Sequence, residues 1–155
     1  MILASPTLSN SYWYIGHLIS ILISSNDTQG AFSVIHGYEI QGLEPPPHIH
    51  TQEEESFYLL DGEMEFTIGD ELHRVSKGDW IMLPRNIPHT FRVISEKAEV
   101  IIHLCPGGFE EYFIAMSEPA EALEIPPRPQ GPPNIQKLVE TASRYGIVFP
   151  MSNKQ

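Results

Sequence analysis

Two apolar-rich segments in the first forty residues have the spacing of β-strands. Ser11 to Ser25 is rich in Tyr, Trp and Ile, and its β-branched residues do not follow a helical period. The turn-forming cluster from Asn26 to Gly30 separates it from a second such segment, Ala31 to Ile40. We therefore predict two strands that pair as an antiparallel hairpin.

Short strands and turns alternate through the middle of the chain. Asp61-Gly62 lies between two apolar runs and is a strong hairpin signal, because glycine adopts the positive φ that a two-residue turn requires. Strands are predicted at Ser56 to Leu60, Glu63 to Ile68, Glu71 to Val75, Trp80 to Leu83, His89 to Ile94 and Ala98 to Leu104. Turns at this close spacing are typical of a sandwich or barrel, which places the chain in the all-β class.

The pattern changes after the last predicted strand. Phe109 to Met116 has apolar residues at i, i+3, i+4 and i+7 and is predicted to be a short helix. Glu118 to Pro133 is dense in proline and is expected to lack regular structure. Asn134 is placed to cap a final helix, Ile135 to Tyr145. We therefore divide the chain into a barrel domain, residues 1–116, and a proline-rich connector with a C-terminal helix that packs on the barrel, residues 117–155.

Composition and charge exclude several classes of partner. Nine Lys and Arg stand against twenty Asp and Glu, which gives a formal charge of −11. A surface this acidic repels phosphate backbones and anionic lipid headgroups, so neither nucleic acid nor a membrane is an expected partner. The single cysteine, Cys105, and the lack of a signal-peptide pattern at the N-terminus favour a cytoplasmic protein. The apolar strand at Tyr12 to Ile23 needs cover, and for this reason we expect a homodimer.

The clearest chemical signal is a set of histidines and a carboxylate. His48 and His50 are two residues apart, so both imidazoles leave the same face of an extended strand. Three glutamates, Glu53, Glu54 and Glu55, follow within reach, and His89 comes one strand pair later, after a proline-rich turn. Three imidazoles and one carboxylate suit a divalent transition metal such as Fe, Mn, Ni, Co, Cu or Zn.

These residues occur at the spacings of two motifs, at residues 42–62 and 78–93, and the chain resembles the cupin superfamily. The residues that carry the resemblance are Gly42, His48, His50, Glu55 and Gly62 in the first motif, and Gly78, Pro84, Asn86 and His89 in the second. Asn86 stands where the family usually has glycine, and asparagine tolerates the left-handed conformation of that turn. The resemblance implies a double-stranded β-helix, or jelly-roll barrel, with one metal ion per chain.

The family spacing also selects among the three glutamates. Counted back from Gly62, the ligand position falls on Glu55, and strand alternation places Glu55 on the same face as Phe57. Glu54 is the alternative ligand, whereas Glu53 is expected to belong to a solvated acidic rim. The resemblance thus implies a metal site of His48, His50, Glu55 and His89.

Within the superfamily the chain resembles the quercetinase-like metal-dependent dioxygenases. In those proteins a metal-bound glutamate also takes a proton from the substrate, which gives Glu55 a second, catalytic role by resemblance. The implied substrate is a flavonol-like or other enolisable hydroxy-ketone. A non-oxidative metal enzyme (an isomerase, lyase or cyclase) and a non-catalytic small-molecule-binding cupin are the alternatives, because the fold supports many chemistries.

Several further side chains are candidates for the substrate pocket. Phe57, Phe66, Phe91 and His103 are candidates for it, although each aromatic residue taken alone is more typical of barrel core, and His103 of a hydrogen-bonded barrel histidine. His36 is expected to be a hydrogen-bonded barrel histidine, and His17 and His73 are expected at the surface or at a strand edge. The sequence therefore predicts a metal-binding barrel with an aromatic pocket.

Overall fold

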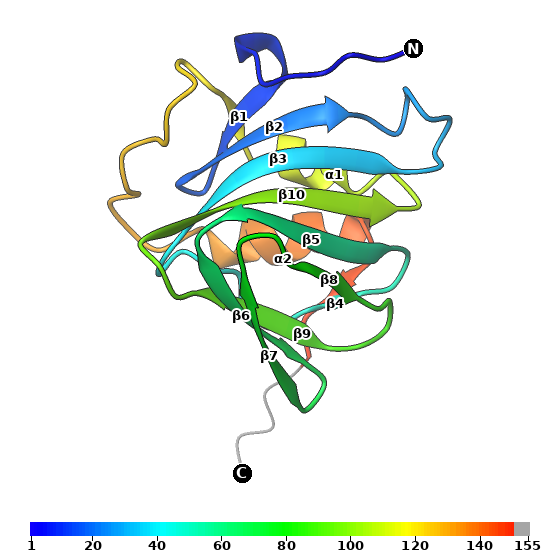
Figure 1. The fold of residues 1–155 in the computed structure, drawn as a ribbon, viewed down its shortest axis with the longest axis vertical. Helices are drawn as coiled ribbons and strands as arrows, with labels where there is room; N and C mark the ends of the chain where they lie inside the picture. Colours follow the sequence, from blue (N-terminus) through cyan, green and yellow to red (C-terminus); the bar gives the residue numbers. More distant parts are fainter. Residues whose placement is uncertain (151–155) are drawn as a thin grey trace.

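The computed structural model describes residues 1–150, and most of its regular structure is β-strand (Figure 1). The strands are β1 Ser11–Tyr14, β2 His17–Ile23, β3 Ser33–Ile40, β4 Ile49–His50, β5 Glu54–Asp61, β6 Glu63–Ile68, β7 Glu71–Ser76, β8 Trp80–Leu83, β9 His89–Val93, β10 Lys97–Cys105, β11 Glu118–Pro119 and β12 Ile147–Val148. The helices are α1 Glu110–Ala115 and α2 Ile135–Arg144, with a 3₁₀ turn at Leu8–Asn10. The predicted all-β class is therefore confirmed.

The strands form a large curved sheet and two smaller ones. The seven-stranded sheet has the order β11-β1-β2-β3-β10-β5-β8, the three-stranded sheet the order β7-β6-β9, and β12 pairs with β4. All of the recorded strand pairs are antiparallel, and β2 pairs with β3 as predicted. The predicted single strand at Ser11 to Ser25 is wrong, because Ile15 and Gly16 take positive φ values of 48° and 90° and turn the chain between β1 and β2.

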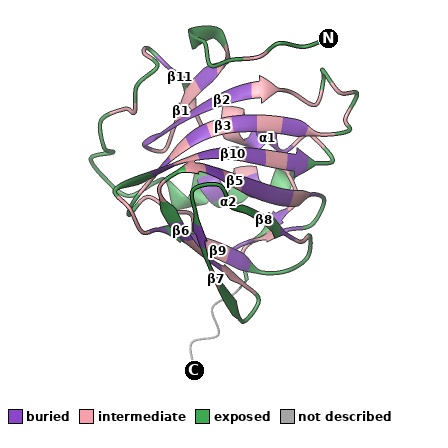
Figure 2. Cartoon of the chain, in the orientation of Figure 1, coloured by how far each residue is buried: buried purple, intermediate pink, exposed green. Residues whose placement is uncertain are grey.

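Alternation along the large sheet separates an inner face from an outer face (Figure 2). Along β3, the odd-numbered positions from Ser33 to Glu39 are buried and the even-numbered ones are partly exposed. Along β10, Ala98, Val100, Ile102 and Leu104 are buried in the same way. The core thus lies between the inner face of this sheet and the elements packed against it, which is the arrangement of a jelly-roll barrel.

Two turns have the backbone conformations that their sequences predict, although the hairpin predicted at Asp61-Gly62 is wrong, because β5 and β6 lie in different sheets. Gly62 has a φ of 90° between β5 and β6, and a Cβ there would lie 2.7 Å from the carbonyl oxygen of Lys97. Asn86 has a φ of 65° in the turn before β9, so asparagine does adopt the left-handed conformation. Its backbone N–H donates to the carbonyl oxygen of His50 at 2.8 Å, which fixes this turn against β4.

The C-terminal segment packs on the barrel, and in Figure 1 both helices lie behind the large sheet. The Asn134 side chain accepts a hydrogen bond from the backbone N–H of Lys137, which confirms the predicted cap of α2. After α2 the chain forms β12, which was not predicted, and the short β11 interrupts the connector expected to lack regular structure. The boundary at residue 116 stays a prediction, and residues 151–155 lie outside the described part of the chain.

The N-terminal strand is covered within the chain. The first five residues of β2 are all buried, and β2 lies between β1 and β3 in the large sheet. This strand therefore gives no reason to expect a second copy, and the homodimer stays a prediction. Among residues 1–150, no helix combines the length and the apolar character needed to cross a membrane.

Candidate metal centre

Backbone pairing brings the three histidines of the motifs together. His48 and His89 exchange two backbone hydrogen bonds, with N···O distances of 3.0 and 2.9 Å. His50 lies two residues further along, on β4, where it pairs with Ile147 of β12. Because residues two apart point to the same face of a strand, His48 and His50 both direct their imidazoles inward.

Glu55 reaches the same point from the large sheet. It lies on β5, opposite Leu83 of β8 and Leu104 of β10. Glu55 and Phe57 are buried, as strand alternation predicts, and only 5% of Glu55 is exposed. Glu54 points the other way, and its carboxylate accepts a hydrogen bond from Arg85 Nε at 3.1 Å. Glu54, the alternative ligand, therefore faces away from the histidines.

The four side chains converge on one small volume. One donor atom from each of His48, His50, Glu55 and His89 lies within 4.8 Å of all the others. The Glu55 Oε2 atom is 3.5 Å from His50 Nε2 and 3.8 Å from His89 Nε2. The ring centroids of His48 and His89 are 4.6 Å apart. An ion placed among these atoms would have four ligands from this chain.

The hydrogen bonds of the rings leave the Nε2 atoms for a ligand. His48 Nδ1 lies 2.9 Å from the carbonyl oxygen of Pro46, and His89 Nδ1 lies 3.0 Å from that of Ile87. A carbonyl only accepts, so both Nδ1 atoms carry the proton and the Nε2 lone pairs are free. His89 Nε2 is buried without a hydrogen-bond partner among the described residues. A buried unsatisfied nitrogen beside two more imidazoles and a carboxylate fits a divalent metal ion.

The burial of Glu53 contradicts the prediction made for it from the sequence. It was expected in a solvated acidic rim, but only 3% of the residue is exposed, and its carboxylate accepts from His50 Nδ1. A carboxylate behind a metal-binding histidine fixes the orientation of the ring and raises its basicity. The sequence contained a signal for this contact. Glu53 follows His50 by three residues, and the chain can turn back at Thr51 and Gln52 before β5 begins.

Burial shifts the proton affinities of the whole cluster. It lowers the pKa of His48 and of His50 to about 4, with the charge of His50 adding to the shift at His48. Burial, with His48 and His50 nearby, lowers the pKa of His89 to about 3. All three rings are therefore neutral near pH 7, the form in which imidazole binds metals.

The two buried carboxyls shift in the opposite direction. Burial raises the pKa of Glu55 to about 8, and the charges of Glu53 and Glu39 add to this effect. Burial raises the pKa of Glu53 to about 7, against the opposing charge of Arg85. A bound cation would favour the ionised form of Glu55 and release its proton.

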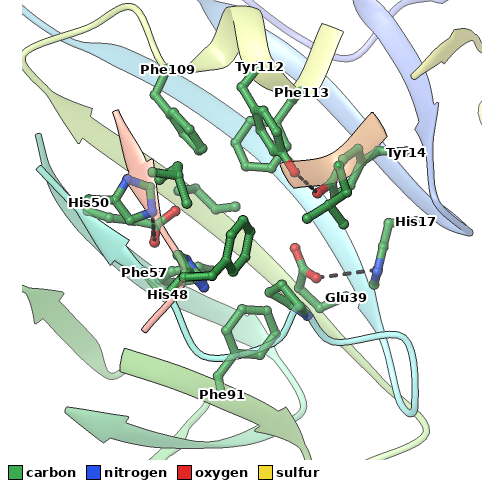
Figure 3. A pocket seen from close by; sticks show the side chains of 16 residues that line it. Tyr14, His17, Glu39, His48, His50, Phe57, Phe91, Phe109, Tyr112 and Phe113 are labelled. Atoms are coloured by element: carbon green, nitrogen blue, oxygen red, sulfur yellow. Dashed lines mark hydrogen bonds and ion pairs between the residues drawn. The ribbon is translucent and has the colours of Figure 1, made fainter. Parts of the chain in front are cut away.

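The metal cluster forms part of the wall of a largely apolar cavity that is rich in aromatic side chains (Figure 3). The cavity is partly open to solvent, and the space among its lining residues is about 580 Å³ with that open solvent included. Phe57 and Phe91 line it, whereas Phe66 and His103 do not, so the assignment of those two residues to the pocket is wrong. Phe66 is core packed against both phenylalanines, and His103 lies on the outer face of β10, beside Phe32.

The C-terminal elements supply much of the wall. Phe109, at the start of α1, packs edge-on against the His50 ring with centroids 4.6 Å apart. Tyr112 and Phe113 of α1, Leu138 of α2, and Ile147 and Phe149 also line the cavity. These residues were not assigned to the pocket from sequence, because their positions depend on how the helices pack on the barrel.

The cavity contains a second polar pair. His17 was expected at the surface, but it is 2% exposed and lines the cavity together with Glu39 of β3. Its Nδ1 atom lies 3.3 Å from Glu39 Oε2. The strand pattern contained a signal for this pair, since Glu39 shares its face with Ile35 and so occupies an inward position. A charged residue at such a position marks a functional candidate.

Comparison with known proteins agrees with this architecture. Residues 34–105 match the cupin domain family, a range that contains all four residues of the metal cluster. These residues form a cupin domain. The fold of an RmlC-like cupin from Shewanella frigidimarina is similar, with a TM-score of 0.58 and 15% identity, over 72% of this chain and 96% of that one.

Two curated relatives are quercetin 2,3-dioxygenases. The protein from Bacillus subtilis (strain 168) is 32% identical over 111 residues, which are 71% of this chain and 33% of that protein. The protein from Aspergillus japonicus is 36% identical over 72 residues, which are 43% of this chain and 21% of that protein. The chain thus spans a third or less of the length of either relative. It has a cupin domain of quercetinase-like sequence, with a cluster able to hold a metal ion.

Proposed function

We propose that this chain is a metal-dependent dioxygenase that acts on a flavonol-like or other enolisable hydroxy-ketone. The observation that carries the proposal is the combination of quercetinase-like sequence with a buried three-histidine, one-glutamate cluster that opens into an aromatic cavity. Structural metal sites are usually closed by protein ligands, whereas a cluster on a cavity wall leaves room for a substrate.

In this proposal Glu55 has two roles. As a ligand it binds the metal together with His48, His50 and His89, and as a general base it takes the proton of the substrate hydroxyl. The bound cation would hold Glu55 in its ionised form, which is the form that can accept a proton from an acidic enol. A bound transition metal supplies a Lewis acid for the resulting anion and the redox chemistry that dioxygen requires.

The remaining residues position the substrate and exclude water. The faces of Phe57, Phe91 and Phe109 form apolar surfaces around the cluster, and they suit a flat aromatic ring. Glu53 acts through His50, whose ring it orients by accepting from Nδ1. The few polar groups in the cavity would then fix the orientation of a largely apolar ligand.

Oxygen uptake tests this proposal. The metal-loaded protein is mixed with quercetin, and dioxygen consumption is followed with an electrode beside the loss of the flavonol absorbance. Glu55→Gln should retain part of the bound metal but lower the turnover number by about 100-fold or more, because the general base is lost. Glu54→Gln is the matched control, since Glu54 faces away from the cluster and pairs with Arg85.

Each outcome has a definite meaning. Normal turnover by Glu55→Gln would remove the general-base role. Product formation without oxygen uptake would identify a non-oxidative enzyme, and tight flavonol binding without any product would identify a binding protein.

A further inference from the structure

Glu39 is a buried carboxyl that the proposed metal chemistry does not use. It lies on the inward-facing side of β3, where the neighbouring inward residues are Ile35 and Gly37, and only 7% of it is exposed. It nevertheless lines the cavity, and Figure 3 shows its carboxyl group among the aromatic side chains, next to His17.

The hydrogen bonds of His17 leave nothing for this carboxyl. The backbone N–H of Ile40 donates to His17 Nδ1 at 3.1 Å, so that nitrogen is an acceptor. The other nitrogen, Nε2, lies 3.1 Å from the carbonyl oxygen of Leu43 and therefore carries the proton. With both nitrogens used by backbone groups, the ring has no N–H left for Glu39 Oε2, which lies 3.3 Å from Nδ1.

No other side chain in residues 1–150 forms a hydrogen bond with the Glu39 carboxyl. Two tyrosines, Tyr14 and Tyr112, bring hydroxyl groups to the cavity wall, and Tyr14 donates to Tyr112 at 3.3 Å. Burying a carboxyl without partners costs free energy, and buried polar groups in proteins are nearly always paired. A group that faces a cavity with its hydrogen-bonding capacity unused is placed to bind a ligand.

The position of Glu39 defines the shape of that ligand. In the large sheet, Glu39 pairs with Ala98 of β10, whereas Glu55 pairs with Leu104 of the same strand. Six residues of strand separate the two positions, roughly 20 Å of backbone, and both side chains point inward to shorten the gap. Between them the cavity wall is apolar, with Ile102, Phe57 and Phe91. The two carboxyls therefore enter the same cavity from two separate positions along β10, with apolar wall between them.

We propose that Glu39 is a substrate-binding residue whose carboxyl hydrogen-bonds to a hydroxyl at the far end of an elongated aromatic substrate, while the other end lies at the metal centre. The inference rests on the proposed function in that the same cavity takes the substrate. It narrows the substrate class to flat aromatic compounds with hydroxyl groups at both ends, such as polyhydroxylated flavonols. His17 lies beside this carboxyl, with its Nδ1 atom 3.3 Å from Glu39 Oε2.

The test compares two flavonols that differ at the far end. Quercetin has hydroxyls on both ring systems, whereas 3-hydroxyflavone has only the hydroxyl that would face the metal centre. Binding of each to the metal-loaded protein is measured under nitrogen by fluorescence titration, so that no turnover takes place. The quantity compared is the ratio of the two dissociation constants, which removes any change common to both ligands.

We expect the wild type to prefer quercetin, and Glu39→Leu to reduce that preference by about 10- to 100-fold through quercetin alone. Glu39→Gln, which keeps a weaker acceptor, should reduce it by about tenfold, and this variant decides the test if Glu39→Leu does not fold. Glu99→Gln is the matched control, because Glu99 pairs with His36 on the outer face of the same sheet. It should leave both constants unchanged.

Three results would overturn the inference: an unchanged preference in both Glu39 variants, an equal loss of both ligands, or no binding of either flavonol by the wild type. Failure of the dioxygenase proposal gives a different pattern. In that case the Glu39-dependent preference for quercetin would persist under nitrogen, but no oxygen would be consumed when air is admitted.

Discussion

The two polar ends of the cavity are built differently. At one end, His48, His50 and His89 point their free Nε2 atoms at the same volume as the Glu55 carboxylate. At the other end, both nitrogens of His17 are already bonded to backbone groups, and only the Glu39 carboxyl has unused capacity. Both ends contain histidine and glutamate, yet only the first can surround an ion.

The difference lies in the groups with which each imidazole forms its hydrogen bonds. A ring that donates from Nδ1 to a backbone carbonyl keeps a lone pair at Nε2, and several such rings can share a metal. A ring that accepts at one nitrogen and donates from the other has nothing left for a ligand. The presence of His and Glu together therefore does not identify a metal site. The direction of the hydrogen bonds around them does.

The largest expected effect is the loss of metal from one end only. His50→Ala removes one of four ligands and leaves a buried gap, so the bound metal should fall from about one ion per chain to less than a tenth of that. Glu39→Gln, at the other end, should retain the wild-type amount. Elemental analysis of the purified proteins measures both. Equal metal loss in the two variants would mean that the ends do not act independently.

A smaller effect is expected behind the metal cluster. Glu53→Gln replaces the carboxylate that accepts from His50 Nδ1 with a neutral amide, which should weaken metal affinity by about 10- to 100-fold. Competition with a chromogenic chelator gives the dissociation constant. Glu54→Gln is the control, since that residue pairs with Arg85 outside the cavity, and its affinity should change by less than twofold. If the two variants behaved alike, Glu53 would have no role in orienting His50.

The smallest effect is a pH dependence of stability that the metal should remove. In the metal-free protein the pKa of Glu55 is raised to about 8, so from pH 6.5 to 8 the folded state holds a proton that the unfolded state has released. The free energy of unfolding should then fall as pH rises, by up to about 1.4 kcal/mol per pH unit from this group. The lowered pKa values of the histidines act only below about pH 6.5, where stability falls as pH falls.

Thermal unfolding across this pH range tests whether the stability of the metal-free protein falls or rises with pH. The melting temperature of the metal-free protein should decrease by about 5 °C between pH 6.5 and 8. Metal-loaded protein should show little change over the same interval, because the cation replaces the proton on Glu55. A metal-free protein that became more stable toward pH 8 would contradict the raised pKa of Glu55.

The elements found from sequence are those whose signals are local. The positive φ of Gly62 and the helix start at Asn134 are confirmed, because a turn or a cap depends on residues a few positions apart. The hairpin predicted at Asp61-Gly62 is wrong, because strand pairing depends on distant segments and places β5 and β6 in different sheets. The inward direction of Glu55 followed from alternation along β5. Alternation showed which residues share a face with His103, but it did not show whether that face points into the barrel. His103 was therefore assigned to the wrong side of the sheet. A strand pattern alone does not say which side of the sheet the cavity occupies.

Glu53 and His17 show the same limit in another form. In the sequence, Glu53 is one of three consecutive glutamates that local pattern does not distinguish. Its burial depends on the turn of the chain between β4 and β5. His17 follows a turn at Ile15 and Gly16 that the apolar run around it concealed. In both cases the side chain is buried by segments distant in sequence, and no local pattern records those contacts.

The sequence by itself determined the all-β class, the positions of the central strands along the chain and the four residues that can hold a metal, since motif spacing and strand alternation are properties of short segments. Only the tertiary structure decided what surrounds that cluster. Pairing of β12 with β4 and packing of α1 over the barrel bring Ile147, Phe149 and Phe109 to the cavity wall. The pairing of His17 with Glu39 likewise depends on β2 lying beside β3. Such contacts join residues far apart in the chain, and they form because burial of the whole molecule favours them, not because any one segment specifies them.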